Sequence, residues 1–209
     1  MRAILALCAL AAGFFWWLLS SREEPDWSAG SWPDAPIQRF LSRPFPETTM
    51  AGMRVTSVAD FSISAKVLST QPYTVAYGSE LSPLDLALGW GRMSEASVLA
   101  EITVNQSGRT AAFFWRSAPP LSLDETIVSS TNLHVIPANA EVRGAVLGLR
   151  RGDLAELRGE LVNVSGPGGF VWNSSVRRDD SGDGACELML VRSVRLLDRP
   201  AGGGKAHLP

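Results

Sequence analysis

Residues 61–67 read FSISAKV, and this heptapeptide decides the fold class that the sequence predicts. Its four apolar residues alternate with two serines and a lysine. A period of two residues places alternate side chains on opposite faces of an extended chain. The stretch therefore predicts a β-strand with one buried face.

Segments that follow this strand carry further strand and helix signals. AEITVNQSGRTAAFFW at 100–115 has two apolar stretches around a polar, glycine-containing turn and predicts a hairpin. Residues 126–136 predict a strand, and Asn139 is placed to cap a helix that starts at Ala140. In SPLDLALGW (82–90) the Ser-Pro start is typical of a short helix or a tight helical turn.

The C-terminal part of the chain adds three expected strands. Gly152-Asp153 predicts a turn into LAELRGELVNV (154–164), in which a bulge at Gly159 would keep the leucines on one side. Residues 170–176 and 187–197 predict the last two strands. The whole pattern predicts an α+β, mostly β domain with one or two short helices. Its expected architecture is a small, partly closed antiparallel barrel of the OB type.

The expected domain spans residues 54–198. The preceding segment, residues 22–53, contains five prolines, and proline at this density opposes a regular helix or a central strand. It is therefore expected to be a tether. Residues 199–209 contain three glycines in a row and are expected to be disordered.

Residues 1–21 predict a transmembrane anchor. Residues 3–19 are an unbroken apolar run, and about 17–25 residues cross a bilayer. Arg2 and the amino terminus supply positive charge before the run, while Arg22 after it is balanced by two glutamates. This asymmetry predicts the N-terminus inside and the domain outside. A cleavable signal peptide is the alternative, since it has the same charge and apolar pattern. The expected location is the bacterial inner membrane, with a single pass and the domain in the periplasm or outside.

Composition excludes some classes of partner. The chain has 209 residues, a formal net charge of −2 and a pI of about 5.7. No surplus of Lys and Arg exists to neutralise phosphates, so a nucleic-acid partner is not expected. Of the two cysteines, Cys8 lies in the apolar run, so the domain is not expected to depend on disulfides. No cofactor or metal is expected.

RRDDSGDGACE at 177–187 supports three interpretations. D-x-S-x-D-G matches the first half of an EF-hand loop, but Leu190 stands where the closing glutamate is needed. Cys186 could be a nucleophile if a base lies beside it. The favoured interpretation is a tight turn between two strands, with Gly184 at positive φ.

Two classes of function remain open. The favoured one is a membrane-anchored, non-enzymatic binding domain for an envelope protein or a small ligand. Its candidate contact residues are Trp90, Trp115, His134, Trp172, Arg177, Asp179 and Glu187. The alternative is an envelope hydrolase in which His134 acts with Cys186, Ser174 or Ser175.

Four motifs resemble those of a family of short, exported or membrane-anchored bacterial proteins with no known activity. They are GSELSPLDLALGWGRMS (78–94), NLHVIPAN (132–139), LRRGDLAELRGELV (149–162) and VWNSSVRRDDSGDGACE (171–187). The resemblance covers residues 77–194 and brings no functional residue with it. It directs attention to Asp85, Trp90, His134, Asn139, Trp172, Ser175, Arg177, Asp179, Cys186 and Glu187. RGDLAELRGELV also resembles an OB-fold strand.

Overall fold

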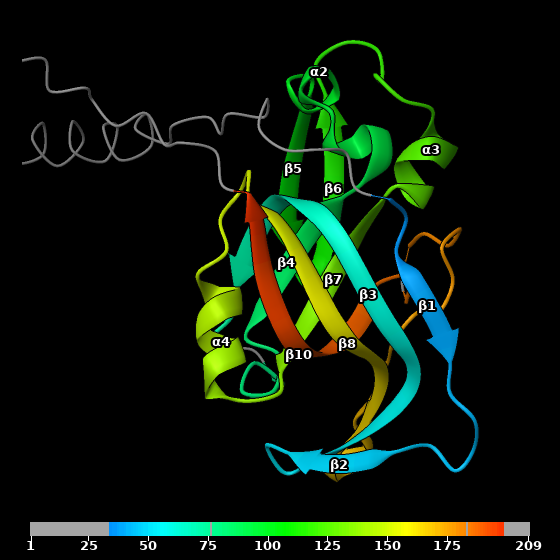
Figure 1. Ribbon diagram of the computed structural model, residues 1–209, viewed down its shortest axis with the longest axis vertical. Coiled ribbons are helices and arrows are strands. Elements are labelled where there is room, and N and C mark those ends of the chain that lie inside the picture. The colour runs from blue at the N-terminus through cyan, green and yellow to red at the C-terminus, as the bar shows by residue number, and fades with distance from the viewer. Residues whose placement is uncertain (1–33, 76, 183, 199–209) are drawn as a thin grey trace, which may run out of the picture.

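The long strand β3 (Met53–Pro72) organises the sheet of the computed structural model, which describes residues 34–198 apart from 76 and 183. Next to β3 lie, in order, β4 (Leu84–Gly89), β7 (Ser130–Pro137), β10 (Glu187–Asp198) and β8 (Leu154–Ser165). β8 then pairs with β3 again, so these five strands form a partly closed ring (Figure 1). Neighbours in the ring are antiparallel except β7 and β10, which are parallel.

The main hydrophobic core lies on the inner face of this ring. All five strands contribute alternate residues to it, among them Phe61, Ile63, Leu86, Leu133, Leu157 and Met189. The expected alternation of FSISAKV is confirmed, since its four apolar residues are buried and the two serines are half-buried. Lys66 departs from the pattern and is also buried.

Three short strands outside the ring extend the sheet. β1 (Ile37–Phe40) and β2 (Glu47–Met50) pair with different parts of β3, and β9 (Val171–Asn173) pairs with β8 after a short 3-10 turn, η2 (Pro167–Gly169). α4 (Ala140–Leu147) connects β7 to β8 and covers the side of the ring near β10 (Figure 1).

An insertion between β4 and β7 stands at one end of the ring (Figure 1). It consists of η1 (Gly91–Ser94), α2 (Ala96–Leu99), the hairpin β5 (Ile102–Ser107)–β6 (Thr110–Trp115), and α3 (Leu123–Val128). A second apolar cluster fixes it to the ring, and in this cluster Leu68 and Ala87 meet Met93, Leu99 and Ile102.

Several local predictions are confirmed. The hairpin turns at residues 108–109, and Gly152 turns the chain at φ +94° before β8. The Asn139 side chain accepts a hydrogen bond from the Val142 N–H and caps α4. The fold class is confirmed as mostly β with short helices.

The helix or helical turn expected in SPLDLALGW is wrong, because Leu84–Gly89 form the strand β4. All six residues of β4 are buried. A strand covered on both faces loses the alternation that identifies a strand, and its apolar run is then ambiguous with a helix.

The tether expected over 22–53 needs correction in its described part, because β1 and β2 lie within it. Each strand begins directly after a proline, Pro36 or Pro46. Proline is tolerated at a strand start and on sheet edges, where no ladder hydrogen bond is lost. The folded part therefore begins before residue 54.

The bulge expected at Gly159 is also wrong. β8 keeps its alternation there, and the irregularities nearest to Gly159 lie in its two partners, where Val58 of β3 and Arg192 of β10 are the extra residues. Gly159 has a different reason. A Cβ at this position would lie 1.9 Å from the carbonyl oxygen of Leu190, so β10 passes too close for any side chain.

The tight turn expected at 177–187 is a longer loop. β9 pairs with β8 and not with β10, so residues 174–186 connect two strands that are not neighbours. The Ser175 N–H donates to the Cys186 carbonyl at 3.0 Å and closes the base of this loop. Gly184 has the expected positive φ, +84°. Asp183 lies outside the described residues.

The expected membrane span, residues 3–19, and the expected tail, residues 199–209, lie outside the described residues. Among the helices of residues 34–198, with 76 and 183 left aside, none has the length and apolarity to cross a bilayer.

Candidate functional site

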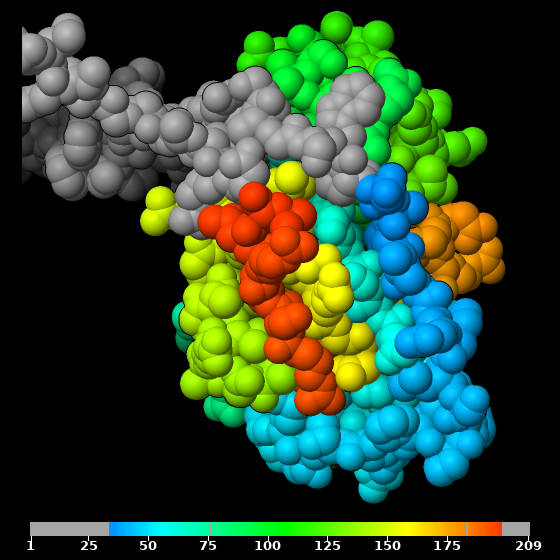
Figure 2. Space-filling view, viewed as in Figure 1, coloured from blue at the N-terminus to red at the C-terminus, as the bar shows by residue number. Residues whose placement is uncertain are grey.

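A cleft of about 330 Å³ opens where the insertion meets the loop before β10. This volume falls within the range of about 300–1,000 Å³ that is usual for small-molecule sites. β6, α3, the start of β7 and the 174–186 loop line it. The loop projects beside β1 (Figure 2), and the Gln38 side-chain amide donates to its Val176 carbonyl at 3.0 Å. The cleft is therefore formed by segments far apart in the sequence.

One wall of the cleft is apolar. Ala111, Phe113 and Trp115, which alternate along β6, line the cleft together with Leu123 and Ile127 of α3. Phe114, on the other face of β6, does not line the cleft and is 55% exposed. This wall offers a surface suited to an aromatic or aliphatic group.

The opposite side of the cleft is polar, and Glu187 is its most buried acid. Glu187 is the first residue of β10 and is only 2% exposed. The Thr131 hydroxyl donates to its carboxylate, which also pairs with the Arg178 guanidinium. Arg178 lies 5.3 Å from the centre of the Phe61 ring. The Arg178–Glu187 pair therefore lies between the 174–186 loop and the strands β3 and β7.

Burial raises the pKa of Glu187 to about 7, although Arg178 acts in the lowering direction and Asp180 adds to the increase. Near neutral pH this carboxyl group changes its charge. A carboxyl group with such a pKa inside a cleft is a frequent feature of functional sites.

Cys186 lines the cleft as a neutral thiol. Burial is the main cause that raises its pKa to about 11. Its Sγ lies 3.7 Å from Nδ2 of Asn132 and 3.9 Å from the carbonyl oxygen of Arg109. A thiol with a raised pKa is a poor nucleophile at neutral pH.

Ser174 and Ser175 use their hydroxyl groups to shape the loop. Ser174 Oγ accepts from the Leu188 N–H and donates to the Ser175 carbonyl. Ser175 Oγ donates to Asp180 at 2.5 Å and accepts from the Arg177 N–H. Both side chains therefore stabilise the conformation of the 174–186 loop.

His134 belongs to a different group of side chains, the Asp85 cluster, which consists of Tyr73, Asp85, Arg109, His134 and Trp172. Its Nδ1 lies 3.0 Å from Oδ1 of Asp85, and its ring centre lies 4.8 Å from that of Trp172. Within the described part of the chain, His134 has no hydrogen bond to Cys186, Ser174 or Ser175. In the described residues, His134 therefore contacts Asp85 and Trp172 and none of the three expected nucleophiles.

Arg109 connects the β5–β6 hairpin to this cluster. Its guanidinium pairs with Asp85 at 2.7 Å and donates to the Ser82 carbonyl at 2.8 Å. It lies 3.7 Å from the centre of the Tyr73 ring. Burial raises the pKa of Tyr73, so its hydroxyl stays neutral at ordinary pH. The cluster therefore fixes the turn between β5 and β6, and β6 forms the apolar wall of the cleft.

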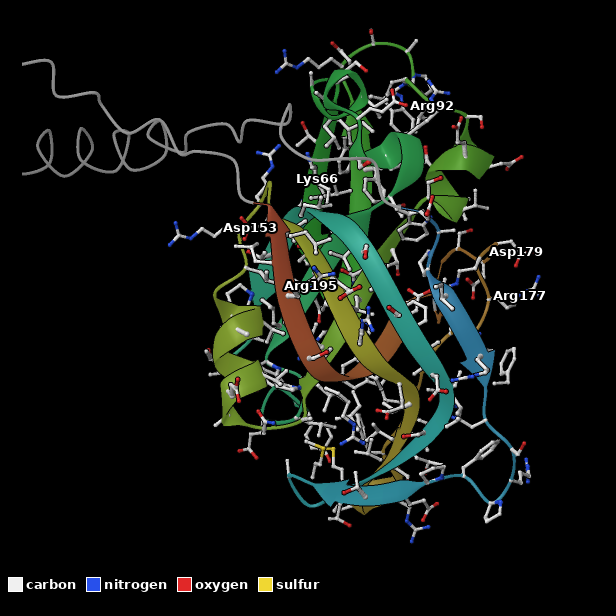
Figure 3. The ribbon with its side chains drawn as sticks, viewed as in Figure 1. Lys66, Arg92, Asp153, Arg177, Asp179 and Arg195 are labelled. Atoms are coloured by element: carbon white, nitrogen blue, oxygen red, sulfur yellow. The ribbon has the colours of Figure 1, made fainter. Side chains whose placement is uncertain are left out.

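The remaining sequence candidates separate clearly. Trp115 and Glu187 line the cleft, whereas Trp90 is buried in the ring core and Trp172 lies in the Asp85 cluster. Arg177 and Asp179 pair at 3.0 Å on the outer side of the loop (Figure 3), although Arg177 also borders the cleft. Asn139 is a helix cap.

Sequence reasoning missed Phe113 and Arg178 as site residues. Phe113 lies in the predicted hairpin, but the face of the hairpin that borders a cleft depends on tertiary contacts. Arg178 follows Arg177, and neighbouring side chains in an extended chain point to opposite sides. This alternation is the one sequence signal that could have placed Arg178 on the inner side of the loop. Among the described residues, no three His, Cys, Asp or Glu side chains are grouped so that they could hold a metal ion.

Comparisons with protein-family models, with curated proteins and with solved structures found no match to the chain.

Proposed function

We propose that the chain is an exported, membrane-anchored domain that binds a small amphipathic molecule in the cleft between β6 and the 174–186 loop. One observation carries the proposal: the cleft joins an aromatic wall to a buried, ionisable carboxyl group. Apolar walls with a few convergent polar groups are typical of small-molecule sites. The apolar part of the ligand would contact Phe113 and Trp115, and its polar part would face Glu187 and Arg178.

The arrangement of the ring supports an OB-type barrel as the scaffold. Five strands form a Greek-key ring, and α4 lies between its third and fourth strands. OB folds bind ligands on their second and third strands and on the loops beside them, including the loop between strands four and five. The cleft lies at the corresponding place, on β7 and the 174–186 loop.

The apolar run of residues 3–19, with Arg2 before it, supports membrane anchoring with the domain outside. An alkaline phosphatase reporter fused after Leu197 would be active only if the domain is exported.

Binding to the cleft can be tested by calorimetry on the full-length chain in lipid nanodiscs. The probes are 3-phenylpropionate, 3-phenylpropionamide and 3-phenylpropylamine, which share one apolar body. At least one should bind, and Phe113→Ala should weaken it about tenfold or more, because the ring loses its apolar contact.

The matched control is Phe114→Ala, which removes the neighbouring ring on the other face of β6. It should leave affinity within about twofold. Absence of binding by all three probes, or equal loss in the two variants, would show that the cleft is not the binding site.

A further inference from the structure

The charged side chains of the cleft do not have equivalent partners. Arg177 pairs with the exposed Asp179, and Asp180 accepts a hydrogen bond from the Ser175 hydroxyl. Arg178 and Glu187 are left as the charged pair at the base of the cleft. A charged group of a ligand that reaches this pair can interact with Arg178 or with Glu187.

Arg178 has hydrogen-bonding capacity in excess of its contacts. Its Nε is buried and has no hydrogen-bond partner among the described residues. A guanidinium offers five N–H donors in a planar fork, which matches the two oxygens of a carboxylate. An unpaired buried donor favours a ligand that brings an acceptor.

Glu187 already has partners for its carboxylate, since Thr131 donates to it and Arg178 pairs with it. A cationic ligand would have to displace Arg178, which the loop holds in place. An anionic ligand would need only that the ion pair between Glu187 and Arg178 be broken. Protonation of Glu187 removes its charge and so weakens this pair.

We propose that the cleft selects carboxylic acids with an apolar body, with Arg178 binding the carboxylate and Glu187 acting as a competing internal carboxylate. This inference rests on the proposed binding function and specifies its ligand class. The apolar body lies against Phe113 and Trp115, and the acid group reaches the base of the cleft.

Affinity for acids should increase as pH falls from 8 to 6. The pKa of Glu187 is about 7, so its carboxylate competes for Arg178 above this pH and is protonated below it. A simple carboxylic acid, with a pKa of about 4.3, remains ionised throughout this range. Asp180 also faces Glu187 and raises its pKa, and Cys186 is neutral because its own pKa is about 11.

The same three probes test the inference by calorimetry at pH 6 and pH 8. The acid should bind about tenfold more tightly than the amide, and the amine should bind most weakly. Arg178→Gln should abolish this preference, while Arg39→Gln, the matched control with an exposed side chain outside the cleft, should preserve it.

Glu187→Gln distinguishes the inference from a loss of folding, because it predicts a gain. The glutamine is neutral like the protonated acid, so 3-phenylpropionate should bind more tightly at pH 8 and its affinity should no longer depend on pH. Weaker acid binding in Glu187→Gln, or the amine as the tightest probe, would overturn the acid selectivity. Binding that still depends on Phe113 in that case would leave the proposed function standing. If no probe binds, both proposals are wrong.

Discussion

Arg109 occupies a backbone position that usually requires glycine or asparagine. It has φ +67° and follows Gly108 at φ +57° in a two-residue hairpin turn. Such primed turns need positive φ at both central residues, and a residue with a Cβ is strained there. The contacts of its side chain with Asp85, Ser82 and Tyr73 offset this strain.

Arg109→Gly should therefore destabilise the protein although it relieves the backbone. Asp85 is fully buried, and the variant leaves its carboxylate without its cation. Removing one partner of a buried ion pair costs about 3 kcal/mol or more. The urea midpoint of the full-length chain, followed by tryptophan fluorescence, measures the change.

Asp85→Asn in the Arg109→Gly background serves as the control. It removes the unpaired charge and should recover part of the lost stability. Equal stability of Arg109→Gly and the unmodified protein would contradict the role given to this pair.

At the scale of elements, β10 leaves no room for a side chain on β8 at Gly159. Gly159→Ala should destabilise the protein by about 1–3 kcal/mol or more, because the new Cβ overlaps the Leu190 carbonyl. Gly144→Ala is the matched control. Gly144 is exposed in α4 and a Cβ there meets nothing within 4 Å, so alanine should stabilise the helix by about 0.5–1 kcal/mol.

Urea denaturation of the two variants gives both values. A Gly159→Ala protein as stable as the unmodified one would mean that β10 does not lie against β8 at this point.

Elements with one exposed face could be predicted from the sequence, and elements determined by tertiary contacts could not. The alternation in 61–67 and the Asn139 cap are local signals, and both are confirmed. β4 lacks alternation because the insertion and the ring bury both of its faces. β1 and β2 are short edge strands whose existence depends on pairing with β3.

The candidate site shows the same limit. Trp115, Cys186 and Glu187 could be selected from residue type alone, and all three line the cleft. His134 could be paired with a nucleophile only by assumption, and it lies instead against Asp85 and Trp172. Which side chains meet is set by strand order, which a single sequence does not state.

For the whole molecule, the ring supplies rigidity and its additions supply the site. Three apolar clusters stabilise the fold. One fills the ring, one packs Phe170 and Trp172 against the ring strands, and one joins the insertion to the ring. The cleft lies between two additions, the insertion after β4 and the loop before β10, and Arg109 fixes the first of them to the ring of strands. Binding sites are commonly formed in this way, by connections on a rigid scaffold.

Hydrogen–deuterium exchange of the full-length chain, with and without saturating 3-phenylpropionate, tests the central claim that this cleft is a binding site. The account predicts slower exchange in β6, in α3 and in residues 174–186, because a ligand held between them suppresses local opening. α4 and β1, which do not line the cleft, should exchange at unchanged rates. Slower exchange confined to α4 or β1, or no change anywhere, would contradict the claim.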